Sequence, residues 1–547
     1  MEFSALHRGH FISRLKSEEF DLLIIGGGIT GCGIALDAAS RGLRVALLEK
    51  NDFAFGTSSR STKLIHGGLR YLKQFEFGLV KEVGSERAIV HNLAPHLVVP
   101  EKMLLPLYEK KGLGYWLTSI GLKIYDWLAG VKSEDQRKML TRVQTLKAEP
   151  LLRQEDVKGG ALYAEYRTDD ARLTIEIAKT AVKYGAILLN YAEVKDFTYQ
   201  NGLINGVEAI DHLGEHDLLI RTRSVVNAAG PWVDALRKSN QSLHGKRLRL
   251  SKGVHIVVAR EKLPIKQAIY FDVDDGRMIF AIPRARITYV GTTDTFYDGS
   301  LDTVVAKPDD AKYLLDAVNS TFPAVGLTFE DIESSWAGLR PLIFEEGKSA
   351  GDLSRKDEIF ESPSGLISIA GGKLTGYRKM AERVVNLVVK KFFTSTSFKP
   401  CHTESIPLVG SNSHKHTDLQ HIRQTLTGHL RHLGVENHIL EQLLENFGPQ
   451  SLEIVNIFLT LERDDDPRLT LLKAQLKFCL RHEMIETLCD FFIRRTGLVY
   501  FNIGNVLSFK DIIANVMARE LSWTPERSAE ELRLLNEAIR QAQVKNF

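Results

Sequence analysis

The stretch from Asp21 to Glu49 constrains the fold of this 547-residue chain more than any other part of its sequence. It opens with the apolar run Leu22 to Ile25, which is short and followed by glycine and is therefore typical of a buried strand. Three glycines in the spacing G-x-G-x-x-G come next: Gly26, Gly28 and Gly31. The spacing alone is a weak signal in a chain with 42 glycines, so its interpretation depends on the residues around it.

The residues after these glycines complete a βαβ unit. A helical pattern continues to Ser40, Arg41-Gly42 is a typical helix end, and Val45 to Leu48 predicts a second strand that ends at Glu49. Glycines here let the backbone approach a pyrophosphate, the helix N-terminus faces its charge, and the glutamate can accept a hydrogen bond from a ribose hydroxyl. The unit therefore predicts dinucleotide binding, with a glycine-rich turn of an ordinary α/β domain as the alternative.

Two later segments favour FAD over NAD. Val225 to Gly230 is a second strand that ends in small residues, and Leu366 to Ala370 is a third that enters the sequence G-G-K-L-T-G at 371–376. A helix is predicted from Tyr377 to Val389, and its N-terminus can stabilise negative charge on a reduced flavin ring. A phosphate-binding loop is the alternative, but the pattern G-x-x-x-x-G-K-S/T is not matched there.

The glycine content divides the chain near residue 395. Only six of the 42 glycines lie after position 400, and a polar stretch that ends at Lys399-Pro400 resembles a linker. Before it, short β-branched runs alternate with helical segments, which indicates an α/β or α+β fold. Beyond it, helical apolar spacing covers 418–433, 436–446, 470–493 and 508–520, and Thr524-Pro525 starts a last helix to about 543. The C-terminal part is therefore predicted to be all-helical.

Composition and charge exclude several classes of protein. With 71 Lys and Arg against 68 Asp and Glu, the net charge of +3 is too small to argue for nucleic acid binding. The four cysteines form no C-x-x-C pair, so no cysteine-based metal site is expected: Cys32, Cys401, Cys479 and Cys489. No apolar run reaches the roughly 18 to 20 residues that span a bilayer, and no secretory signal is recognised. A cytoplasmic protein with no bound metal is the resulting expectation.

Basic residues beside glycines mark a candidate site for an anion. Arg70, Arg340, Arg355 and Lys373 are placed in this way, and guanidinium groups bind phosphate or carboxylate bidentately. His255 follows Lys252-Gly253-Val254 on a predicted strand and has the chemistry of a general base. Solvated surface charges and a structural histidine are the alternatives at these positions.

The chain resembles the FAD-dependent, respiratory glycerol-3-phosphate dehydrogenases. The segments that carry the resemblance are Thr57-Ser58-Ser59, 63–72, 167–173, Gly230-Pro231-Trp232-Val233, Gly291-Thr292-Thr293-Asp294 and 371–375. It covers about 20–395, and 481–483 with 492–496 resembles the C-terminal helical domain of that family. The chain departs from the family in two places. It has a polar extension before Phe20, and it has Ala229 where many members have threonine.

The resemblance implies a glutathione-reductase-like FAD-binding Rossmann domain interleaved with a mixed-sheet substrate domain, followed by an all-helical domain. The expected ranges are 1–19 for the N-terminal extension, 20–75, 155–240 and 356–393 for the FAD-binding domain, 76–154 and 241–355 for the substrate-binding domain, 394–403 for the linker and 404–547 for the helical domain.

It also implies roles for single residues. His255 would take the proton of the substrate C2 hydroxyl with Arg340 close by, while Arg70, Tyr71, Arg355 and Lys373 would hold the phosphate. Hydride would pass from C2 to flavin N5 and give dihydroxyacetone phosphate. The expected FAD-binding residues are Gly26, Gly28, Gly31, Glu49, Thr57, Ser58, Ser59, Lys63, His66, Gly67, Gly68, Ala229, Gly230, Gly372, Leu374 and Thr375.

Three functions remain open at this point. A dehydrogenase of glycerol catabolism would pass electrons to a membrane quinone, an oxidase would pass them to oxygen, and a silent flavoprotein would only bind a partner. The oxidase branch of the resemblance usually carries an inserted segment that is not seen here, and the intact His255, Arg340 and Lys373 speak against the third function.

The expected location follows from the first function. The aromatic segment 112–130 suits either a membrane interface or a buried core helix. The expectation is therefore a cytoplasmic protein, peripheral at the inner face of the cytoplasmic membrane, with a homodimer as a further possibility.

Overall fold

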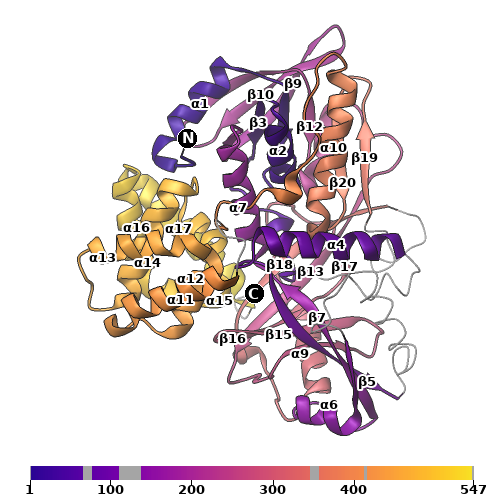
Figure 1. Cartoon of the computed structure of the whole chain (residues 1–547), viewed down its shortest axis with the longest axis vertical. Helices are drawn as coiled ribbons and strands as arrows, with labels where there is room; N and C mark the ends of the chain where they lie inside the picture. The colour runs from indigo at the N-terminus through magenta and orange to yellow at the C-terminus, as the bar shows by residue number, and fades with distance from the viewer. Residues whose placement is uncertain (1, 66–76, 110–136, 345–355, 412–415, 545–547) are drawn as a thin grey trace.

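The computed structural model describes residues 2–65, 77–109, 137–344, 356–411 and 416–544 (Figure 1). Several predictions fall outside these ranges. They are the predicted site residues His66, Gly67, Gly68, Arg70, Tyr71 and Arg355, and the aromatic segment 112–130.

The βαβ unit forms the centre of a six-stranded sheet, with the order β19 (Asp357–Glu361), β20 (Ile367–Gly371), β12 (Val225–Asn227), β2 (Leu22–Ile25), β3 (Val45–Leu48) and β8 (Ile187–Leu189). The last five strands are parallel, and β19 is an antiparallel edge. Every residue of β2 and β3 is buried, which explains why both read as unbroken apolar runs.

Helices cover this sheet. The first of them, α2 (Ile29–Arg41), packs against β2 and β3 and contacts α7 (Asp170–Lys183) on one side and α10 (Tyr377–Phe392) on the other. It ends at Gly42, whose φ of +104° is the left-handed conformation that a helix C-cap favours. A short helix, α8 (Val233–Ser239), follows β12. The strand, helix and strand expected in 22–48 are all present.

A four-stranded sheet lies beside this layer, with the order β1 (Glu19–Phe20), β11 (His216–Thr222), β10 (Leu203–Asp211) and β9 (Ala192–Gln200). The residues before it, expected as an N-terminal extension, form helix α1 (Arg8–Ser17). Phe11 and Leu15 are fully buried, and the Arg8 guanidinium pairs with Asp211 at 2.6 Å. The extension is therefore packed onto the sheet that it precedes.

A ten-stranded sheet makes the second half of the structure. Its order is β17 (Thr295–Phe296), β13 (Leu248–Ala259), β16 (Ile287–Gly291), β15 (Met278–Arg284), β14 (Ala268–Asp272), β5 (Val99–Tyr108), β7 (Val157–Arg167) and β4 (Leu64–Ile65), with β18 (Ile332–Ile343) on β13 and β6 (Lys138–Thr141) on β7. Helix α6 (Arg142–Ala148) contacts β7 and α9 (Pro308–Thr321) contacts β13, whereas α4 (Phe77–Leu93) contacts the 3₁₀ turns Leu374–Gly376 and Thr403–Ser405 and reaches β7 through the Arg87–Glu165 ion pair. Both β4 and β7 pair here, although their ranges were assigned to the FAD-binding domain.

The C-terminal residues form the expected group of helices, drawn in yellow and orange in Figure 1. They are α11 (His416–Leu430), α12 (Asn437–Phe447), α13 (Ser451–Thr460), α14 (Pro467–His482), the π-helical turn η10 (Asp490–Arg495), α15 (Leu498–Phe501), α16 (Ile503–Glu520) and α17 (Pro525–Ala542).

The sequence pattern misjudged the extent of one of these helices and missed another. A single helix over 470–493 is wrong, because α14 ends at His482 and Met484 adopts a φ of +47° that no α-helix contains. Helix α13 was not predicted. Thr524 caps α17 as expected, since its hydroxyl accepts a hydrogen bond from the Arg527 N–H. Among the described residues, no helix is both long and apolar enough to cross a membrane.

Candidate active site

The glycine loop after β2 is built by close backbone contacts. Gly26 has a φ of +112°, and a Cβ added to it would lie 2.7 Å from the Ala228 carbonyl oxygen at the end of β12. A Cβ on Gly31 would lie only 1.9 Å from the Gly26 carbonyl oxygen. Neither position tolerates a side chain, so the loop stays tight and its backbone remains open to a ligand.

The N-terminus of α2 provides N–H groups for an anion. Gly28 is its N-cap and supplies no side-chain cap, while the Ile29 N–H donates to the Ser58 hydroxyl at 2.9 Å. Helix N-termini of this kind bind phosphate groups because unpaired N–H donors and the helix dipole point the same way. The loop and this helix end together fit the pyrophosphate of a dinucleotide.

Glu49 holds the glycine loop from the adjacent strand. One carboxylate oxygen accepts from the Gly27 N–H at 2.7 Å and the other from the Asn51 N–H at 2.9 Å. Burial raises the pKa of this carboxyl above its ordinary value, although both backbone donors oppose the shift. Each oxygen keeps a further lone pair, so the residue can still accept the expected ribose hydroxyl.

Substitution of Gly31 by alanine is expected to abolish FAD binding. The new methyl group would overlap the Gly26 carbonyl oxygen and force the loop away from the helix N-terminus. The ratio of flavin to protein absorbance after purification measures the effect. Gly9→Ala is the matched control, because no atom lies within 4 Å of its added Cβ. A Gly31→Ala protein that purifies with parental FAD would show that the loop does not hold the cofactor.

The ends of three parallel strands meet at this loop. Since β12 lies between β2 and β20, the small residues Ala229 and Gly230 after β12 and the segment 371–375 after β20 occupy the same sheet edge as the glycine loop. Gly372 has a φ of +79°, and its added Cβ would meet the Met380 sulfur at 2.5 Å. Lys373 precedes the 3₁₀ turn η6 (Leu374–Gly376), which leads directly into α10.

Two of the three hydroxyl residues at 57–59 form hydrogen bonds to neighbouring elements. The Thr57 hydroxyl donates to the Leu339 carbonyl at 2.6 Å, which ties the turn η2 (Thr57–Ser59) to β18, and Ser58 holds α2 as described. The Ser59 hydroxyl is buried and makes no hydrogen bond within the described part of the chain. Of the three hydroxyls, it is the one that makes no hydrogen bond to the described residues.

Lys63 lies in a buried ion pair. Its ammonium group donates to Asp170 and lies 3.8 Å from Asp169, and these carboxylates raise its pKa above the ordinary value against the effect of burial. The acidic residues at 169–170 are part of the segments that carry the family resemblance. Their negative charges keep the Lys63 ammonium group protonated, whereas burial alone would favour its neutral form.

His255 and Arg340 lie on neighbouring antiparallel strands. In the pairing of β13 with β18, Ser251 is opposite Arg340, Gly253 is opposite Gly338 and His255 is opposite Trp336. Alternate residues of a strand share one face, so the histidine and the arginine project to the same side. The sequence predicted both residues as candidates but carried no sign of this register.

Two glycines make room for these side chains. A Cβ on Gly291 of β16 would lie 2.1 Å from the His255 ring, and a Cβ on Gly253 would lie 2.4 Å from the Arg340 guanidinium. The guanidinium donates to the Thr292 hydroxyl at 3.0 Å, to the Thr293 carbonyl at 3.2 Å and to Asp294 at 3.3 Å. The G-T-T-D sequence thus orients the arginine and leaves space for the imidazole.

The environment of His255 keeps its imidazole neutral. The side chain is buried, and Nε2 lies 3.1 Å from the Thr62 hydroxyl. Burial, followed by the positive charges of Arg340 and Lys63, lowers the pKa well below its ordinary value of 6.5. Nδ1 makes no hydrogen bond within the described residues. A neutral imidazole with an available nitrogen can act as a proton acceptor.

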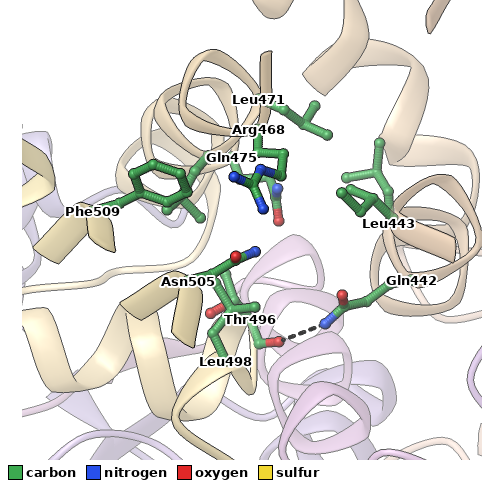
Figure 2. Close-up of a pocket in the computed structure, with 11 residues that line it drawn as sticks. Gln442, Leu443, Arg468, Leu471, Gln475, Thr496, Leu498, Asn505 and Phe509 are labelled. Carbon is green, nitrogen blue, oxygen red and sulfur yellow. Dashed lines mark hydrogen bonds between the residues drawn. The ribbon is translucent and has the colours of Figure 1, made fainter. Parts of the chain in front are cut away.

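A separate pocket lies wholly within the helical domain (Figure 2). Its walls come from α12, α14 and α16 and from the chain on both sides of Gly497, and the Gln442 amide donates to the Thr496 carbonyl across it at 3.4 Å. The predicted site residues lie in other parts of the chain.

Family models match both parts of the chain. A model described as FAD dependent oxidoreductase matches residues 21–378, and one described as the C-terminal domain of alpha-glycerophosphate oxidase matches 401–528.

Among curated relatives, the aerobic glycerol-3-phosphate dehydrogenase of Staphylococcus aureus (strain USA300) is 47% identical, over 99% of this chain and 98% of its own. The glycerol-3-phosphate dehydrogenase from Bacillus halodurans, solved in complex with FAD, superposes with a TM-score of 0.84 at 44% identity and covers 99% of this chain and 98% of its own. The FAD-bound L-alpha-glycerophosphate oxidase from Mycoplasma pneumoniae, at 18% identity and a TM-score of 0.57 over 70% of this chain and 96% of its own, shares the fold.

These matches confirm the predicted fold class, the family resemblance and FAD as the cofactor. The glycine loop, the N-terminus of α2 and the sheet edge formed by β2, β12 and β20 fit that cofactor. The chain belongs to the aerobic glycerol-3-phosphate dehydrogenase family of FAD-dependent oxidoreductases.

Proposed function

We propose that this protein oxidises sn-glycerol 3-phosphate to dihydroxyacetone phosphate and passes the electrons to a membrane quinone, as a step of glycerol catabolism. The observation that carries the proposal is the buried, neutral His255 beside the oriented guanidinium of Arg340. This pair has the chemistry that oxidation of a secondary alcohol needs, because a base must take the hydroxyl proton while positive charge stabilises the oxygen left behind.

The residues have distinct roles in this proposal. His255 accepts the C2 hydroxyl proton, and Arg340, fixed by Thr292, Thr293 and Asp294, stabilises the developing charge on the oxygen. Bound FAD supplies a hydride acceptor for C2. The protonated imidazole then lies near two cations, Arg340 and Lys63, whose repulsion favours release of the proton to solvent.

Binding of the phosphate is assigned to Lys373 together with Arg70, Tyr71 and Arg355. Lys373 supports this assignment by its place at the sheet edge, between the end of β20 and the turn η6. Anchoring a phosphate away from the reacting carbon orients C2 and contributes binding energy to the reaction. The cofactor roles of the glycine loop, Glu49, 57–59, Lys63, 66–68, Ala229, Gly230 and 372–375 belong to the same proposal.

The quinone acceptor sets the proposed location. A quinone dissolves in the bilayer, so the protein must meet the membrane surface, and the described residues contain no helix that could span it. We therefore infer a peripheral position at the inner face of the cytoplasmic membrane.

The test is an anaerobic titration of the purified protein with glycerol 3-phosphate, glycerol and lactate, followed by the visible absorbance of the flavin. Bleaching by glycerol 3-phosphate alone is expected, since only this compound carries a phosphate. A flavin that glycerol or lactate bleaches equally well would exclude the proposed substrate.

The electron acceptor is tested with the reduced protein, which is mixed either with a short-chain quinone or with oxygen. Rapid reoxidation by the quinone supports the proposed acceptor, whereas fast oxygen consumption with release of hydrogen peroxide would assign an oxidase.

A further inference from the structure

The segment after η10 extends from the helical domain to the ten-stranded sheet. Helix α15 contacts β18, and Figure 1 shows it at the border between the yellow helices and the strands. The Ser334 hydroxyl of β18 donates to the Tyr500 carbonyl at 2.6 Å, and the Arg286 guanidinium donates to the Phe501 carbonyl at 3.2 Å. The backbone at 500–501 is therefore anchored to the sheet that carries His255.

The side chains at 500 and 501 support one indole ring. The Trp336 ring lies 5.5 Å from the Tyr500 ring and 5.9 Å from the Phe501 ring, which meets it edge to face at 77°. Phe501 and Trp336 are both buried, with 6% and 3% of their surface exposed. Aromatic pairs at these distances pack favourably and leave little freedom to tilt.

Trp336 in turn supports the imidazole. Its ring is stacked on His255 at 4.7 Å with an angle of 12° between the planes, and its Nε1 donates to the Ser61 carbonyl at 3.1 Å. The one hydrogen bond of the imidazole to described residues is that with Thr62. The imidazole is therefore held by the Thr62 hydroxyl, by the stacked indole and by the Tyr289 ring at 6.4 Å. The indole in turn rests against the rings of Tyr289, Tyr500 and Phe501.

We propose that Phe501 is a positioning residue: together with Tyr500 it holds Trp336 against His255, so that the C-terminal helical domain completes the active site from behind. The inference rests on the proposed role of His255 as the base. It gives the helical domain a part in the reaction that does not require contact with the substrate.

Charged groups also face this cluster. The Arg284 guanidinium lies over the Phe501 ring at 4.3 Å and the Lys63 ammonium at 5.7 Å, while Arg340 and Lys63 act on His255 itself. Arg284 and Lys63 are buried together with the phenyl ring. Its removal would change both the angle of the indole and the solvation of the imidazole.

Phe501→Leu is expected to slow flavin reduction by glycerol 3-phosphate about 10- to 100-fold, the range that a small misplacement of a catalytic group produces. The affinity for the substrate should change less than about twofold, because the phosphate site is elsewhere. Phe501→Tyr, which keeps the ring, should remain within about threefold of the parent. Anaerobic stopped-flow measurements over a range of substrate concentrations separate the rate from the affinity.

Phe458→Leu is the matched control. Phe458 is fully buried in α13 of the same domain and packs in the cluster of the helical core, so its substitution also leaves a cavity. We expect a similar fall in melting temperature for both leucine variants and a parental reduction rate for Phe458→Leu alone. Equal slowing in the two variants would assign Phe501 a merely structural role and overturn the proposal.

A measurement independent of turnover separates this inference from the proposed function. In protein labelled with ¹³C-histidine, the His255 signal is identified by its loss in His255→Gln and is followed against pH. Phe501→Leu should raise the pKa of this imidazole toward 6.5, since water then reaches the ring, and Phe458→Leu should not. If glycerol 3-phosphate fails to reduce the parent, the proposed function fails while this titration still decides the positioning role. An imidazole that titrates as in the parent overturns that role.

If Phe501→Leu does not fold, Tyr500→Leu tests the support of Trp336 by the same two measurements.

Discussion

Replacement of His255 by alanine is expected to slow flavin reduction by glycerol 3-phosphate about 10²- to 10⁴-fold, the contribution typical of a general base. The variant should retain FAD, because the glycine loop and the N-terminus of α2 belong to a different sheet. Anaerobic stopped-flow absorbance measures the rate, and the flavin absorbance of the purified protein measures the cofactor content.

The control is His96→Ala. His96 is buried like His255, yet it lies against Gly410 and Gly448 rather than at the sheet that carries Arg340. Its loss should reduce stability without slowing flavin reduction. A His255→Ala protein that is reduced at the parental rate would show that another group takes the proton.

The pH dependence of the parent follows from the same residue. Because the pKa of His255 lies well below 6.5, the neutral base persists through neutral pH, and the reduction rate should fall only when the pH drops through that lowered value. The free energy of unfolding should also fall with pH. Below about pH 6.5 this histidine is protonated in the unfolded chain but stays neutral in the folded chain, so protonation favours unfolding. A fall in rate centred at or above pH 6.5 would contradict this assignment.

Asp52→Ala is expected to destabilise the protein by about 3–5 kcal/mol, the cost of leaving buried charges without their partner. Asp52 accepts hydrogen bonds from Arg495 at 2.7 and 2.9 Å and from Arg494, and all three side chains are buried. Burial opposes ionisation of the carboxyl, but the two arginines outweigh it and lower its pKa. The melting temperature and the denaturant midpoint measure the loss.

The same substitution should weaken FAD retention. Two residues after Asp52, the Ala54 N–H donates to the Gly27 carbonyl at 3.0 Å, and the Phe53 ring lies against the same glycine. Asp302→Ala is the control, because its partner Lys50 belongs to the same loop, but the Asp302 side chain is 60% exposed. Such exposed pairs contribute about 1 kcal/mol or less. Comparable losses of FAD in the two variants would show that the pairing of Asp52 with Arg494 and Arg495 does not support the glycine loop.

Local signals explain what the sequence predicted well. The strand, glycine loop, helix and strand of 22–48 are adjacent in the chain, and each boundary is marked by glycine or by a change of hydrophobic period. The helix expected over 470–493 failed for the opposite reason. After His482 the chain makes contacts that no local pattern encodes, because the Glu483 carboxylate pairs with Arg172 and Lys179 and the Met484 N–H donates to the Phe3 carbonyl.

The candidate site could be predicted only in part. His255 and Arg340 have telling residue types and glycine neighbours, whereas Trp336 and Phe501 look like ordinary core residues. Their importance depends on the register of β13 with β18 and on contacts made by residue 501, and neither leaves a local trace in the sequence. Gly253 and Gly291 stand in recognisable sequence motifs, but the need for glycine there follows only from the closeness of the Arg340 guanidinium and the His255 ring.

The position of β2 has a consequence for the biosynthesis of the protein. This strand emerges from the ribosome early, yet its neighbour β12 begins at Val225 and the next strand, β20, at Ile367, while the N-terminal Ser4 hydroxyl bonds the Leu480 carbonyl. Its partner on the other side, β3, follows at once, but at about 5–20 residues per second β12 and β20 are synthesised about ten seconds to about a minute later. We therefore expect FAD to bind only late in translation, because the sheet edge that fits it is incomplete until β20 has been synthesised.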